Sequence, residues 1–179
     1  MWGYKNEPPA PSCATDLAVM LSVAAQFHWS CAATHVGLPW HCWAVVPSSR
    51  RNRAGEHPLI EVVQASGLSI EQVPIMLNGS PDDGRQVRID RFGVPEIALV
   101  AGRHVLLIED TWVTGASAQS AAVALKQAGA TAVTILCLAR WLREDPDWPA
   151  ERDFFENLTT PYDPLICPVL GGLCSGPIQ

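Results

Sequence analysis

The chain of 179 residues has no long run of basic residues and no apolar segment long enough to cross a bilayer. Its formal net charge of −6 disfavours bulk attraction to nucleic acid or to an anionic membrane surface. Its apolar segments are about ten residues or fewer, whereas a membrane helix needs about 20. The stretch 1–13 contains Glu7 and three prolines and does not resemble a signal peptide. We therefore expect a cytoplasmic protein that binds neither nucleic acid nor membranes.

Close metal-ligand spacings are also scarce. None of the six cysteines forms a CxxC pair, and the one close pair is Cys167 and Cys174, with the spacing C-x6-C. Reduced, mostly buried thiols are the ordinary state of such cysteines in a cytosolic protein. A zinc site built from Cys167, Cys174 and a histidine is the alternative, although its spacing is not the usual one. The five histidines show neither HxxxH nor HxH spacing, which disfavours metal binding through them.

Apolar residues are plentiful, at 48% of the chain against 17% charged. This balance is typical of a compact globular protein. A chain of this length buries a substantial core without disulfides or metal. No internal repeat and no low-complexity segment interrupts it, so we expect residues 1–179 to form one domain. No Gly-x-Ser-x-Gly motif or catalytic Cys-His pattern supports a hydrolase.

Hydrophobic patterning predicts helices and strands in alternation. Strands are expected at 42–46, 70–77, 104–110 and 131–141. Helices are expected at 12–29, from Pro58 to just before Gly67, from 116 to about Gly129, and at 149–158. Strand, helix and strand between 104 and 141 have the spacing of a βαβ unit, so the fold class is expected to be α/β with a parallel central sheet.

The sequence IEDTWVTGASAQS, residues 108–120, lies where one predicted strand ends and the next helix begins. In open α/β sheets, ligands bind at the carboxyl ends of the strands. Gly115 permits a tight turn, and the N-terminus of the following helix offers unpaired N–H groups. The hydroxyls of Thr114, Ser117 and Ser120 add donors. This segment therefore suits a phosphate monoester.

A dinucleotide-binding loop is the competing interpretation of Thr-Gly in this place. The loop TGxxxGxG of short-chain dehydrogenases would need glycine at 119 and 121, but those positions hold Gln119 and Ala121. The Tyr-x-x-x-Lys pair of that family is absent as well. The dehydrogenase interpretation is therefore rejected.

The stretch VLLIEDTWVTGAS, residues 105–117, resembles the phosphoribosyl-diphosphate (PRPP) motif of type I phosphoribosyltransferases. The resemblance implies that Glu109 and Asp110 are the catalytic acids and face the ribose hydroxyls. It also implies a loop around the 5-phosphate, formed by Val113, Thr114, Gly115, Ala116 and Ser117. Over roughly residues 43–67 and 85–140 the chain is similar to the ComF-like, or amidophosphoribosyltransferase-like, branch, although that branch's cysteine-rich zinc module is missing and Glu56 replaces its phenylalanine.

The family resemblance implies a type I phosphoribosyltransferase fold: a central, mainly parallel sheet flanked by helices, with a small variable hood. It implies that Ser48, Ser49 and Arg50 bind pyrophosphate, with Arg51 and Arg53 nearby. Mg²⁺ would bridge pyrophosphate and ribose, and no protein residue is assigned as its direct ligand. The family's tendency to dimerise implies a homodimer.

The implied activity is transfer of phosphoribosyl from PRPP to a small nitrogenous acceptor, with release of pyrophosphate, in nucleotide metabolism. Trp112, Arg140 and Trp141 are the candidate acceptor residues, although each tryptophan could equally be a core residue. Val113 stands where 6-oxopurine enzymes carry an aspartate, which argues against hypoxanthine or guanine. A loop at 78–91, with Arg85, Arg88 and Arg91, is expected to close over pyrophosphate. A non-catalytic regulator that binds PRPP or a nucleotide is the alternative.

Overall fold

The computed structural model describes residues 11–48, 57–78, 86–142, 161, 163 and 165–173. Its centre is a four-stranded sheet with the order β2-β1-β5-β6, in which every pair of neighbours is parallel. The strands are β1 (Cys42–Val45), β2 (Glu71–Gln72), β5 (His104–Trp112) and β6 (Ala132–Arg140). The helices are α1 (Pro11–Val36), α2 (Pro58–Ala65) and α3 (Ala116–Gln127). The predicted α/β class is confirmed.

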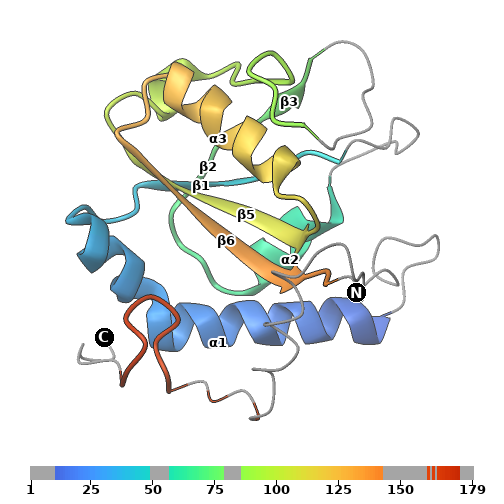
Figure 1. The fold of residues 1–179 in the computed structure, drawn as a ribbon, viewed down its shortest axis with the longest axis vertical. Coiled ribbons are helices and arrows are strands. Elements are labelled where there is room, and N and C mark those ends of the chain that lie inside the picture. The colour runs from blue at the N-terminus through green and yellow to red at the C-terminus, as the bar shows by residue number, and fades with distance from the viewer. Residues whose placement is uncertain are drawn as a thin grey trace.

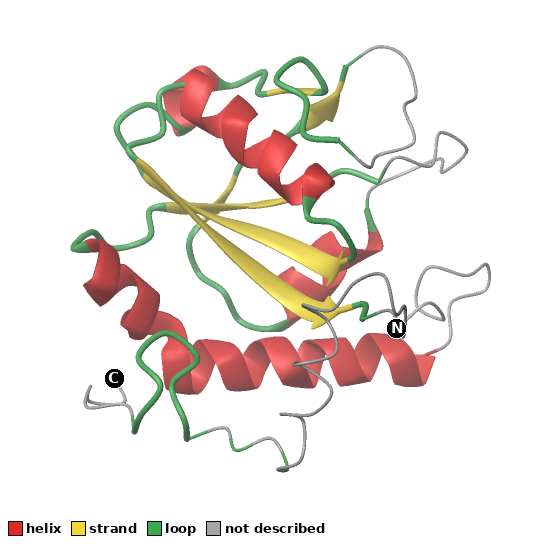
Figure 2. Cartoon of the chain, viewed as in Figure 1, coloured by secondary structure: helices red, strands yellow, loops and turns green. Residues whose placement is uncertain are grey.

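Helices cover both faces of the sheet, as Figures 1 and 2 show. α3 packs on one face, where Ala121 and Leu125 join Val105 and Leu107 of β5 in one core cluster. α1 and α2 pack on the other, where a second cluster forms. Its members include Leu17, Leu21, Leu59, Val63, Leu106 and Ile108. β5 is apolar at successive positions because alternate side chains enter the two clusters, as expected of a parallel strand covered on both faces.

The ends of α2 follow the sequence signals. Pro58 is the first helical residue, and Nδ1 of His57 accepts a hydrogen bond from the N–H of Leu59 at 3.2 Å. Gly67 follows the helix with φ +81°, a conformation that glycine adopts at little cost. The structure thus confirms the expected start at Pro58 and the stop before Gly67.

The single strand expected at 70–77 is wrong. The segment contains β2 and a second short strand, β3 (Met76–Leu77), and the two belong to different sheets. Pro74 lies between them and has no N–H for a ladder. β3 pairs antiparallel with β4 (Phe92–Gly93) near α3, and the 3-10 helix η2 (Ile97–Leu99) leads toward β5.

No single described helix is both long enough and apolar enough to cross a membrane. The two halves of α1, Ser12–His28 and Ser30–Val36, pass that test only as a pair bent by 52°, on length and composition alone. The helix expected at 149–158 lies outside the described residues.

Candidate functional site

The carboxyl ends of β1 and β5 meet at one edge of the sheet. Val45 is in register with Ile108, and the N–H of Val46 donates to Ile108 O at 3.0 Å. Ser48 therefore follows β1 close to where the acidic pair follows Ile108. The structure brings these two predicted segments together, whereas Ser49, Arg50, Arg51 and Arg53 lie outside the described residues.

Glu109 and Asp110 lie within β5, where successive side chains point to opposite faces. Asp110 is 4% exposed, whereas Glu109 is only partly buried. Cys137 of β6 is in register with Glu109, so the acid pair also lies beside strand β6. Their assignment to the ribose hydroxyls stays a prediction, and Glu109 is the more accessible of the two carboxylates.

The turn between β5 and α3 is built around Gly115. Gly115 has φ +78° and immediately precedes α3, whose first N–H groups point toward the turn. A methyl group at this position would overlap the indole of Trp112, so the glycine is required by both its conformation and its neighbour. Thr114 Oγ1 accepts from the N–H of Ala116 at 3.3 Å, which fixes the entry to the helix. The result is a tight turn that leads straight into a helix N-terminus, a common arrangement for binding phosphate.

Ser120 does not contribute a hydroxyl to this turn, so that expectation is wrong. Its side chain is buried, donates to Ala116 O at 2.6 Å and accepts from the N–H of Arg88 at 2.9 Å. Ser120 instead attaches the segment before β4 to the first turn of α3. Val113, Thr114 and Ser117 remain at the surface or partly buried.

The arginines expected in a closing loop are placed differently. The guanidinium of Arg88 pairs with Asp90, with Nη2 and Oδ2 2.8 Å apart. Arg91 is 5% exposed, and its guanidinium carbon lies 5.2 Å from the centre of the Phe92 ring. Arg88 is thus engaged by a neighbouring carboxylate at the surface, whereas the Arg91 side chain is buried. Arg85 lies outside the described residues.

The three candidate acceptor residues lie together at the ends of β5 and β6. Trp112 is in register with Arg140, and the N–H of Trp141 donates to Trp112 O at 2.8 Å. Trp112 is partly buried, while Arg140 and Trp141 are exposed. Trp40 and Trp43 are at least half-buried, and Nε1 of Trp43 donates to Ile70 O at 3.0 Å, in agreement with packing roles.

A pocket of about 540 Å³ lies beside these residues. Its lining consists of Trp112, Ile135, Cys137, Leu138, Ala139 and Arg140. An indole, several apolar side chains and one guanidinium suit a small planar molecule with a polar edge. Sequence reasoning missed Ile135 and Cys137, because only the register of β6 against β5 shows that Cys137 lies opposite Glu109 and Ile135 opposite Leu107.

Cys137 lies in surroundings that disfavour its ionised thiolate. Burial raises the pKa of its thiol above the ordinary value, and the carboxylates of Glu109 and Asp110 add to the rise against the opposing hydrogen bonds to the backbone of Ala139 and Trp112. Its Sγ donates to Ala139 O at 2.9 Å. A raised pKa lowers the fraction of thiolate, and this disfavours a role for Cys137 as a nucleophile.

The fold and the site together define an α/β protein. At the carboxyl edge of its sheet lie an acid pair, a tight turn before a helix N-terminus, and a pocket. No protein-family model matches the chain, and no curated protein matches it. A crystal structure of adenine phosphoribosyltransferase superposes with a TM-score of 0.50 at 18% sequence identity, over 80% of this chain and 76% of that one. This likeness shows the fold: it is that of the type I phosphoribosyltransferases.

Two further solved structures are similar at lower scores. Hypoxanthine phosphoribosyltransferase of Trypanosoma cruzi matches at 13% identity and a TM-score of 0.46, over 72% of this chain and 75% of that one. The allosteric regulatory enzyme of purine biosynthesis matches at 17% identity and a TM-score of 0.41, over 68% of this chain. This chain spans only 26% of the length of that enzyme. The ComF-like branch stays a prediction.

Proposed function

We propose that this protein is a Mg²⁺-dependent phosphoribosyltransferase that transfers phosphoribosyl from PRPP to a small nitrogenous acceptor and releases pyrophosphate. One observation carries the proposal. The two carboxylates at the end of β5 are followed within a few residues by left-handed Gly115 and the N-terminus of α3. The two carboxylates can accept hydrogen bonds from a vicinal diol, and the turn can bind a phosphate. In PRPP the diol and the 5-phosphate belong to one ribose.

The phosphate and ribose sides follow from this order. Residues 113–117 would surround the 5-phosphate with backbone N–H groups and hydroxyls, since the dipole of α3 favours an anion there. Glu109 and Asp110 would accept hydrogen bonds from the ribose hydroxyls and so position C1 of the sugar. Pyrophosphate would leave toward Ser48, which follows the neighbouring strand β1.

The carboxylate oxygens of Glu109 and Asp110 fit the proposed metal, because Mg²⁺ prefers hard oxygen ligands and is commonly held by one or two carboxylates together with substrate phosphates. Bound Mg²⁺ supplies positive charge that stabilises the leaving pyrophosphate. The protein's own contribution is to align the sugar, the leaving group and the acceptor.

The acceptor side is assigned to the pocket beside Trp112. The indole of Trp112 would stack on a planar base, and Arg140 and Trp141 would border the opening. Val113 is 45% exposed and carries no carboxylate to contact a base nitrogen. Hypoxanthine and guanine are therefore expected to be poor acceptors.

The decisive experiment incubates the full chain with PRPP, Mg²⁺ and a panel of nitrogenous bases, and measures pyrophosphate release. Acceptor-dependent release is expected, and it should be lost in Glu109→Ala/Asp110→Ala. Glu96→Ala is the matched control because Glu96 is an exposed carboxylate that precedes η2, away from the acid pair. That variant should release pyrophosphate at the rate of the unaltered protein.

Calorimetric titration with PRPP separates transfer from binding. Binding of PRPP without release of pyrophosphate for any base would overturn the transferase function and favour a regulatory protein that binds PRPP. Absence of PRPP binding by the unaltered chain would overturn both functions.

A further inference from the structure

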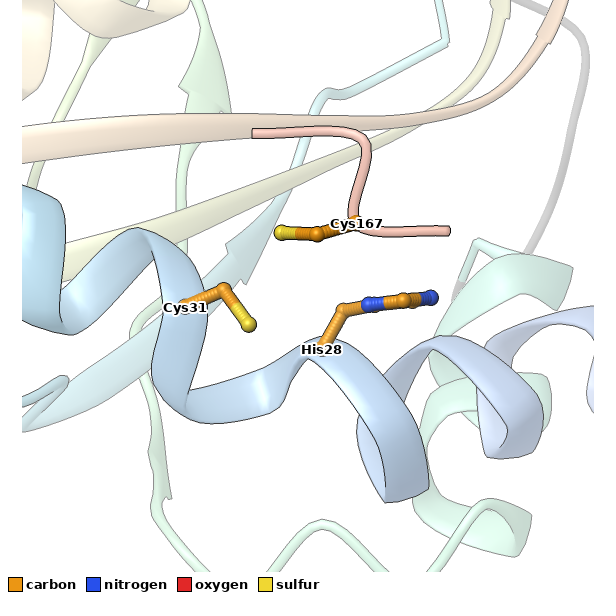
Figure 3. A group of neighbouring side chains, drawn as sticks. All are labelled: His28, Cys31 and Cys167. Atoms are coloured by element: carbon orange, nitrogen blue, oxygen red, sulfur yellow. The ribbon is translucent and has the colours of Figure 1, made fainter. Parts of the chain in front are cut away.

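Three potential metal ligands gather on the side of the molecule where α1 lies (Figure 3). The ligand atoms of His28, Cys31 and Cys167 all lie within 4.8 Å of one another. The three residues are 7%, 9% and 0% exposed, respectively. His28 and Cys31 of one helix thus lie close to Cys167, which comes from a segment far away in the sequence.

α1 presents two of the ligands together. His28 and Cys31 are three residues apart, and residues at this spacing share one face of a helix. The 52° bend between Ser12–His28 and Ser30–Val36 falls between them. Figure 3 shows both side chains directed to the side from which Cys167 approaches.

Cys167 is held in a short turn of its own. Its N–H donates to Gly172 O at 2.7 Å, its carbonyl accepts from the N–H of Gly171 at 2.8 Å, and Ile166 pairs with Leu173. Apolar burial does not explain why this turn lies against α1. Among residues 165–173 only Cys167 is buried, while Leu170 is 60% and Leu173 76% exposed.

We propose that His28, Cys31 and Cys167 bind Zn²⁺ as a structural site that fastens the segment 165–173 to α1. Thiolate and imidazole are the ligands of structural zinc sites, and softer sulfur ligands disfavour Mg²⁺ and Ca²⁺. Tetrahedral zinc with these ligands separates the donor atoms by about 3.6–3.8 Å, which the cluster reaches by a small contraction. Binding converts both thiols to thiolates and releases their two protons.

The site is separate from the proposed PRPP site. The three ligands come from α1 and the segment 165–173, whereas the acid pair and the turn belong to β5 and α3. Three ligands leave one position of a tetrahedral ion, which water or a further protein ligand fills. Cys174, which follows Leu173 in the sequence, provides a variant that separates these two cases.

The test measures zinc in the full chain, purified under reducing conditions, by inductively coupled plasma mass spectrometry. One zinc ion per chain is expected, and Cys31→Ser and Cys167→Ser should each lose it. Cys13→Ser is the matched control, since Cys13 is a partly buried cysteine of the same helix outside the cluster, and it should keep its zinc. Zinc content unaffected by Cys167→Ser would overturn the proposal.

Cobalt(II) provides a second measurement, whose main result comes from the unaltered chain. Added to the metal-free, reduced chain, Co²⁺ should give the intense visible bands of tetrahedral coordination and a thiolate-to-cobalt charge-transfer band. If Cys174→Ser loses part of that band, Cys174 supplies a third thiolate ligand. If the band is unchanged, the ion has two thiolate ligands, Cys31 and Cys167. Both results support the site. A spectrum of octahedral Co²⁺, or a disulfide between Cys31 and Cys167 in the protein as purified, would overturn it.

Discussion

The two ends of β5 both carry polar residues, but they use them differently. At the amino end, His104 is 0% exposed, with Nδ1 2.9 Å from Leu38 O and Nε2 2.9 Å from Thr134 Oγ1. The backbone N–H of His104 also donates to Nδ1 of His41 at 3.1 Å. Both ring nitrogens of this buried side chain are therefore matched by protein groups, which is the usual condition of a structural polar residue.

At the carboxyl end, the polar groups occur beside a turn and a pocket to which we assign the proposed ligands. Glu109 and Asp110 are followed by a left-handed glycine, a helix N-terminus and a pocket next to Trp112. The difference teaches that burial alone is a poor guide to candidate functional residues: His104 is more buried than either acid. What distinguishes the acids is their position at the edge where ligands of parallel sheets bind.

The largest effect is expected from Gly115→Ala at the carboxyl end. An alanine must adopt a left-handed conformation that costs roughly 1–2 kcal/mol, and its methyl group must also displace the Trp112 indole. The turn that would hold the 5-phosphate changes shape as a result. We expect the affinity for PRPP to fall at least about tenfold, which titration calorimetry measures.

Gly102→Ala is the matched control at the amino end of the same strand. Gly102 has φ +74°, but a methyl group there meets nothing within 4 Å. Gly102→Ala should therefore lower the unfolding free energy by the conformational cost alone, and it should leave PRPP affinity unchanged. Equal losses of affinity in both variants would mean that the turn has no special role.

A large effect of a different kind is expected from His104→Ala, because it concerns stability and not binding. The change removes two side-chain hydrogen bonds and leaves a cavity, which together cost about 2–4 kcal/mol of unfolding free energy. Urea denaturation measures this loss, with His35→Ala, an exposed residue of α1, as the near-neutral control. PRPP affinity should stay unchanged in the folded variant; a specific loss of binding would refute the structural assignment of His104.

The part of this comparison that sequence could predict was local. The apolar run 104–110, the Thr-Gly turn and the alanine-rich helix after it each follow from short-range patterns, and all three elements are present. The single strand expected at 70–77 failed because the pattern could not show that the residues on either side of Pro74 pair with different partners.

The part that sequence could not predict depends on contacts between distant segments. The pocket beside Trp112 requires the register of β5 against β6, which no local pattern contains. Likewise, His28 and Cys31 showed no metal-site spacing, because their potential partner, Cys167, approaches from the other end of the chain. The sequence predicts Ser120 as a phosphate donor, because only the fold reveals that its hydroxyl bonds to Ala116 O.

The smallest effect is expected from the ion pair that lies beside His104. Arg103 Nη1 is 2.8 Å from Glu71 Oε2, and the side chains are 36% and 50% exposed. Solvent and salt screen such a pair, so Glu71→Gln should cost no more than about 1 kcal/mol of unfolding free energy. A double-mutant cycle with Arg103→Gln isolates the coupling between the two side chains. If that coupling matched the loss in His104→Ala, exposed charge would stabilise this end of β5 as much as the buried imidazole, and the importance given to burial there would be wrong.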